Sequence, residues 1–322
     1  MNMISNWIGK LVLAGLVVFT ISSTVGVAAA EEPTAAKAVL VTGASSGIGK
    51  RTTELLASKG YFVYAGARKQ KDLDALNAMK NVEAVRLDVT VQEDIDNAVK
   101  QISKGGRGLY GVVNNAGVAI VAPLVEVKEQ DLDFLFNVNI YGPYRITKAF
   151  FPLLMESKGR VVNISSISGV LSGPLLGPYS MSKHAFEAYN DSLAHELKQF
   201  DISVSAIEPG NYASKITASA KKRVVDKGDT YAGSLYEKQL TGFMAGASRD
   251  QYADPIAVAE AIDHALFNDA PKARYMVVPN QQEAQVTIGK AMQEMVQLNH
   301  DHPYSYDRDA LVKMLDEALG NL

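Results

Sequence analysis

A tyrosine and a lysine four positions apart, Tyr179 and Lys183, have the types and spacing that most directly suggest chemistry. On a helix this spacing puts both side chains on one face. A free phenol has a pKa of about 10 and is a poor base at neutral pH, but a neighbouring ammonium favours the phenolate. Ser166, at the end of an apolar segment, is suited to hydrogen-bond a substrate oxygen. The three residues predict proton exchange with an alcohol or carbonyl oxygen while a hydride moves to or from a nicotinamide.

A glycine-rich turn lies between the first apolar strand after residue 36 and a helical pattern that begins near Lys50. Glycines let a backbone approach a pyrophosphate closely, and the free N–H groups at a helix start favour an anion. The turn therefore predicts a dinucleotide phosphate site made by Gly43, Ser45, Ser46, Gly47, Ile48 and Gly49.

The end of the second predicted strand carries Arg68 and Lys69, where an acidic residue would suit the 2′-hydroxyl of NAD. A guanidinium offers charged donors to the oxygens of a 2′-phosphate. We therefore expect NADP(H) to be preferred. If the two side chains are only solvated charges at a helix start, the preference is open and NAD(H) is possible.

The elements that position these residues alternate between short apolar strands and amphipathic helices from residue 37 to about residue 279. This alternation predicts an α/β fold, a single doubly wound Rossmann-type domain with a parallel sheet and helices on both faces. The expected strands are 38–42, 62–67, 84–88, 111–114, 160–165, 202–208 and 275–278. The expected helices include 50–59, 92–104, 130–155, 179–200 and 255–267.

Several motifs occur in a fixed order over residues 37–279, and together they resemble the short-chain dehydrogenase/reductase family. They are Thr42-Gly43-x-x-x-Gly47-Ile48-Gly49, Asp88-Val89, Asn114-Asn115-Ala116-Gly117, Asn139, Ser166, Tyr179-x-x-x-Lys183 and Pro209-Gly210. The segments 108–113 and 205–211 are most similar to the retinol, 17β-hydroxysteroid and 3-hydroxybutyrate dehydrogenase group. The resemblance implies an apolar alcohol or carbonyl substrate, although that group also handles small hydroxy acids.

The resemblance also implies roles for individual residues. Asn139 would hold a water on the proton relay to Lys183, which would also bind the nicotinamide ribose. Asp88 would lie near the adenine ring, and Ser214 would contact the carboxamide. The remaining implied cofactor contacts are Val89, Asn115, Ala116, Gly117, Pro209 and Gly210.

Composition limits the other possibilities. The chain has 322 residues, 47% of them apolar, a net charge of −3 and no cysteine, so disulfides, thiolate metal sites and cysteine nucleophiles are excluded. With this charge we expect no nucleic-acid partner. We also expect no metal site, because His300 and His302 stand in a polar loop without further ligands.

Residues 1–30 have the basic start, apolar middle and small-residue end of a secretory signal peptide, with Ala28-x-Ala30 as the cleavage site. Residues 11–30 are also long enough to be an uncleaved membrane anchor. Either interpretation predicts an exported or membrane-anchored protein rather than a cytoplasmic one. The leader lacks a twin-arginine pair, so export of a cofactor-loaded enzyme is unexplained.

Two segments depart from the strand and helix alternation. Residues 211–253 are expected to form a substrate-loop insertion, and residues 280–322 a helical extension with a polar loop at 299–308. By resemblance we expect a homodimer or homotetramer. A non-catalytic dinucleotide-binding sensor or scaffold is the alternative function, which the intact Tyr179 and Lys183 disfavour.

Overall fold

The computed structural model describes residues 37–226, 228, 231–246, 248–249 and 251–320. The predicted signal peptide or anchor at 1–30 lies outside these residues and stays a prediction. Within the described part of the chain, no helix is long and apolar enough to cross a membrane.

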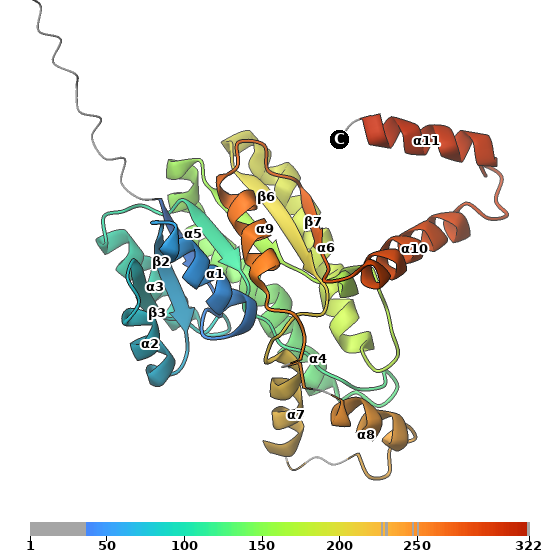
Figure 1. Ribbon diagram of the computed structural model, residues 1–322, viewed down its shortest axis with the longest axis horizontal. Helices are drawn as coiled ribbons and strands as arrows, with labels where there is room; N and C mark the ends of the chain where they lie inside the picture. Colours follow the sequence, from blue (N-terminus) through green and yellow to red (C-terminus); the bar gives the residue numbers. More distant parts are fainter. Residues whose placement is uncertain (1–36, 227, 229–230, 247, 250, 321–322) are drawn as a thin grey trace, which may run out of the picture. The chain divides into compact units, whose positions relative to one another are not determined.

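Seven strands form one parallel sheet in the order β3-β2-β1-β4-β5-β6-β7 (Figure 1). The strands are β1 (Ala38–Val41), β2 (Phe62–Ala67), β3 (Val82–Arg86), β4 (Gly111–Asn114), β5 (Arg160–Ile164), β6 (Ser203–Pro209) and β7 (Arg274–Val277). The strand order reverses direction between β1 and β4, which leaves a crevice at their carboxyl ends. The predicted doubly wound fold is therefore confirmed.

Helices cover both faces of the sheet because successive strand side chains point to opposite sides. Val39 and Val41 of β1 join the core beneath α1 (Gly47–Ser58), α2 (Gln70–Asn77) and α9 (Ile256–Phe267). Leu40 joins the opposite core, beneath α3 (Gln92–Lys104), α5 (Gly142–Ser157) and α6 (Gly177–Leu197). Figure 1 shows α1 and α9 side by side on the same face.

The expected helix 130–155 is interrupted in the structure. It divides into α4 (Glu129–Phe136), a π-helical segment η1 (Asn137–Tyr141) and α5. Such bulges are frequent at functional sites, and this one contains Asn139. Short 3-10 segments follow β5 at Ile167–Gly169 (η2) and α6 at Lys198–Phe200 (η3).

The two segments outside the alternation contain helices. Residues 211–253 include α7 (Ile216–Asp226) and α8 (Glu237–Ala245). The extension comprises α10 (Gln281–Leu298) and α11 (Arg308–Gly320), on either side of the predicted polar loop. The third strand lies two residues earlier than expected, at Val82–Arg86 rather than 84–88, because its register is set by pairing with β2.

Candidate active site

A cavity of about 510 Å³ runs along the carboxyl ends of the strands, across the point where the strand order reverses. It gathers most of the residues predicted from the sequence. They are Gly43, Ser45, Ser46, Gly47, Ile48, Arg68, Asp88, Val89, Asn115, Ala116, Gly117, Ser166, Tyr179, Lys183, Pro209, Gly210 and Ser214. Gly49, Lys69 and Asn139 were also predicted but do not line it.

The glycine-rich turn has the backbone that a phosphate site needs. Gly43 and Gly47 have positive φ values of +67° and +53°, which disfavour any residue with a Cβ. The turn leads into α1, whose N-cap residue Ser46 makes no side-chain cap hydrogen bond. The N–H groups at the helix start therefore remain available to an anion. These features fit a dinucleotide pyrophosphate.

Asn115 ties the end of β4 to this turn. Its side-chain Nδ2 donates to the main-chain oxygens of Thr42 and Gly43 at 2.8 and 3.2 Å. The Thr42 hydroxyl in turn accepts from the main-chain N–H groups of Asn115 and Ala116, both at 3.0 Å. A Cβ on Gly49 would lie 2.3 Å from the same Nδ2. Gly49 therefore allows close packing behind the turn and does not face the cavity.

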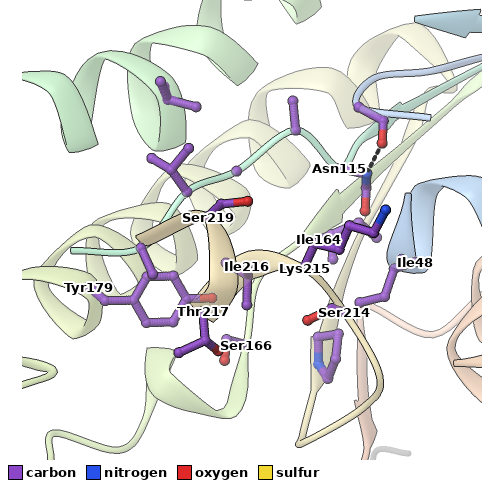
Figure 2. A pocket seen from close by; sticks show the side chains of 18 of the residues that line it. Ile48, Asn115, Ile164, Ser166, Tyr179, Ser214, Lys215, Ile216, Thr217 and Ser219 are labelled. Atoms are coloured by element: carbon purple, nitrogen blue, oxygen red, sulfur yellow. Dashed lines mark hydrogen bonds between the residues drawn. The ribbon is translucent and has the colours of Figure 1, made fainter. Parts of the chain in front are cut away.

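Ser166, Tyr179 and Lys183 line the other end of the cavity, where Figure 2 shows Ser166 close to Tyr179. Ser166 follows β5, whereas Tyr179 and Lys183 lie on one face of α6. The Lys183 Nζ donates to the main-chain oxygen of Ile164 at 2.8 Å and lies 5.8 Å from the centre of the Tyr179 ring. The structure therefore brings the predicted trio together.

The electrostatics of this trio differ from the expectation. Burial raises the pKa of the Tyr179 phenol, and a hydrogen bond with Ser166 and the charge of Arg249 offset only part of the rise. Burial also lowers the pKa of the Lys183 ammonium to about 8, against the opposing influence of Glu187. The expected net lowering of the Tyr179 pKa by Lys183 is not found, because desolvation outweighs the hydrogen bond with Ser166 and the charge of Arg249.

Asn139 lies behind the cavity wall and is 1% exposed. Its side-chain Oδ1 accepts from the main-chain N–H of Val118 at 2.9 Å. Its Nδ2 donates to the main-chain oxygen of Val118 and to the Ser182 hydroxyl, both at 3.0 Å. The side chain thus connects the loop after β4 to α6. Its part in a proton relay stays a prediction.

At the adenosine end, the Arg68 guanidinium lies 3.4 Å from the Asp88 carboxylate. Burial pushes the pKa of Asp88 upward, but hydrogen bonds from Thr90 and the charge of Arg68 reverse this and lower it overall. Asp88 is therefore a carboxylate at neutral pH. The Arg68 side chain is 61% exposed and keeps donors free for a phosphate.

Sequence patterns did not single out the residues that the 211–253 segment brings to the cavity. Lys215, Ile216, Thr217, Ser219, Phe243 and Arg249 all line it. The C-terminal extension also reaches the site, because the Glu283 carboxylate on α10 accepts from the main-chain N–H of Asn211 at 2.8 Å. The sequence predicted a helical extension here, and the capping pattern at Asn280 and Glu283 marks the start of α10 but not its contact with the site.

Comparison with known proteins agrees with this geometry. A family model described as short chain dehydrogenase matches residues 37–224. The mitochondrial D-beta-hydroxybutyrate dehydrogenase of Mus musculus is 34% identical over 266 residues, covering 74% of this chain and 76% of its own. An NADPH-dependent 3-dehydrocapnine reductase of Ornithobacterium rhinotracheale is 36% identical over 257 residues, covering 74% and 87%.

A solved structure shares the fold as well. The crystal structure of a short-chain dehydrogenase from Streptomyces avermitilis matches with a TM-score of 0.69 at 32% identity, over 82% of this chain and 95% of that one. The chain therefore belongs to the short-chain dehydrogenase family and is an NAD(P)-dependent oxidoreductase acting on CH–OH groups.

The packing behind the phosphate turn makes a testable prediction. Gly49→Ala places a methyl group against Asn115 and 2.5 Å from the Gly43 main-chain oxygen, so we expect at least a roughly tenfold loss of NADPH affinity and a lower melting temperature. Titration of intrinsic fluorescence and thermal unfolding measure both. Gly289→Ala is the matched control, because this helical glycine has nothing within 4 Å of its Cβ position. NADPH affinity equal to wild type in Gly49→Ala would contradict this account of the turn.

Proposed function

We propose that this protein is an NADP(H)-preferring oxidoreductase that interconverts an apolar alcohol and its carbonyl, with Tyr179 as the general acid and base. The observation that carries the proposal is that the Ser166 and Tyr179 hydroxyls are hydrogen-bonded in the same cavity that the glycine-rich turn lines. When bound, the nicotinamide supplies or accepts the hydride.

The residues around Tyr179 have distinct parts in this reaction. Ser166 and Tyr179 orient the substrate oxygen, and Tyr179 gives it a proton during reduction or takes one during oxidation. The raised pKa keeps the phenol protonated at neutral pH, which suits reduction of a carbonyl. Lys183, charged below its pKa of about 8, assists the phenolate that proton donation leaves.

The cavity walls support an apolar substrate. Val121, Leu176 and Phe243 line the cavity and belong to a small apolar cluster that is separate from the two main cores. Relatives differ in the substrates their names state, a hydroxy acid for one and retinol for another. For this chain we propose a substrate with an apolar carbon skeleton. We also expect the protein to be a homodimer or homotetramer at an exported or membrane-anchored location.

Replacing the proposed acid and base tests catalysis directly. Tyr179→Phe keeps the ring but removes the proton, so turnover should fall by about 10²- to 10⁴-fold while NADPH binding is retained. NADPH oxidation with a panel of apolar ketones and aldehydes measures turnover, and fluorescence titration measures binding. Tyr304→Phe is the control, since that tyrosine is 82% exposed. Tight NADPH binding by the wild type without turnover of any carbonyl or alcohol would instead favour the sensor or scaffold.

The pH profile should report the state of Lys183. Because burial places its pKa at about 8, the ammonium is charged below that pH and loses its proton above it. The phenol stays protonated through the same range. We therefore expect kcat for carbonyl reduction to be constant near neutral pH and to fall as pH rises through about 8. Measurement at saturating NADPH checks this, and constant activity up to pH 10 would contradict it.

Cofactor preference should depend on Arg68. Loss of a guanidinium contact to the 2′-phosphate in Arg68→Gln should raise the KM for NADPH about tenfold, and the KM for NADH by less than about twofold. Lys100→Gln is the matched control, because Lys100 is an exposed cation of α3 outside the cavity lining. Equal changes for the two dinucleotides would show that Arg68 does not select the phosphate.

A further inference from the structure

The reaction end of the cavity has apolar walls and one cation whose purpose the proposed reaction leaves unexplained. Arg249, in the segment after α8, lines the same cavity as Tyr179 and Ser166. It is partly buried. Proton exchange with an alcohol oxygen needs Tyr179, Ser166 and Lys183 but gives no role to a guanidinium.

Arg249 differs from Arg68, the other arginine of the described cavity lining, in having no carboxylate partner. Arg68 pairs with Asp88. Among the described residues Arg249 forms no ion pair, and its guanidinium lies 5.7 Å from the centre of the Tyr252 ring. The described cavity lining contains a single carboxylate, Asp88, which lies at the adenosine end. A partly buried cation beside apolar walls is costly unless an anion meets it.

The guanidinium shares one cavity with the reacting centre, since Arg249, Tyr179 and Ser166 all line it. Burial raises the pKa of the Tyr179 phenol, and the positive charge of Arg249 is one of two influences that lower it. A substrate in this cavity can therefore place an anionic group against Arg249 and its carbonyl oxygen against Tyr179. A guanidinium binds carboxylates and other oxyanions through parallel hydrogen bonds, so it would fix orientation as well as charge.

We propose that Arg249 binds an anionic group of the substrate, so that the substrate is an oxo acid or hydroxy acid with an apolar chain rather than an uncharged ketone or alcohol. The proposal rests on the oxidoreductase function proposed above and specifies its substrate class. The carbon chain would contact Val121, Leu176 and Phe243, while the anion lies against Arg249.

The anionic group takes no part in the bond changes. In reduction, the carbonyl carbon accepts the hydride from the reduced nicotinamide and the carbonyl oxygen accepts the Tyr179 proton. In oxidation, the same hydride and proton leave the alcohol. The anion affects the step only through charge, because it offsets the influence of Arg249 on Tyr179 and favours the protonated phenol.

The test compares medium-chain beta- and gamma-oxo acids with their methyl esters, which keep the carbonyl and the chain but remove the charge. For the wild type we expect kcat/KM to be at least about tenfold higher for the acids. Arg249→Gln should lower the acid-to-ester ratio of kcat/KM by about 10- to 100-fold, and Arg249→Lys should restore part of it. Lys238→Gln is the matched control, because Lys238 is an exposed cation of α8 outside the cavity lining, and it should leave the ratio unchanged.

A second measurement needs no variant and so does not depend on the folding of Arg249→Gln. With a methyl ester as substrate, a fatty carboxylate should inhibit the wild type at least about tenfold more strongly than the amide of the same chain. Equal inhibition, or an acid-to-ester ratio near one that Arg249→Gln does not change, would overturn the anion site while leaving the oxidoreductase function intact. No turnover of acids, esters, ketones or aldehydes would overturn the oxidoreductase function itself.

Discussion

The hydrogen bonds between Asn115 and the phosphate turn are the constraint on which the site depends. They hold the ends of β1 and β4 together where the strand order reverses. A parallel sheet that winds in both directions must leave a crevice there, because its helices leave toward opposite faces. Thr42 and Asn115 fix the width of that crevice with side chains, and Gly49 lets them approach. The phosphate turn and the wall after β4 therefore form one rigid surface.

Burial decides the chemistry at the opposite end. Lys183 is 6% exposed, and its ammonium donates to the main-chain oxygen of Ile164. Desolvation disfavours the charged forms of both side chains, so it lowers the pKa of the Lys183 ammonium to about 8 and raises that of the Tyr179 phenol above its ordinary value. A neutral phenol beside an ammonium that loses its proton near pH 8 is an arrangement suited to donating a proton at neutral pH. The same burial that makes the pair costly to fold thus keeps Tyr179 protonated at neutral pH.

Local patterns predicted the parts of this site that are contiguous in sequence. The strands, the glycine turn and the Tyr179 to Lys183 spacing each depend on neighbouring residues, so they were found at nearly the right positions. The interruption at Asn137–Tyr141 was missed because the apolar periodicity of 130–155 continues across it. β3 was misplaced by two residues, a shift that preserves which side chains face each core. Arg249 and Glu283 could not be found, because only tertiary packing brings Arg249 to the cavity and Glu283 to the main chain of Asn211.

The distribution of charge along the cavity connects the cofactor to the substrate. Its described lining holds four cationic side chains, Arg68, Lys183, Lys215 and Arg249, against the single carboxylate of Asp88. A bound dinucleotide would bring phosphates to Arg68 and to the glycine-rich turn, and Lys215 lines the same cavity. A nicotinamide is not an anion, so the part of the cofactor that would react beside Tyr179 would not neutralise Arg249. Whatever balances that charge must enter with the substrate, which is why a chain with apolar cavity walls still favours an acid.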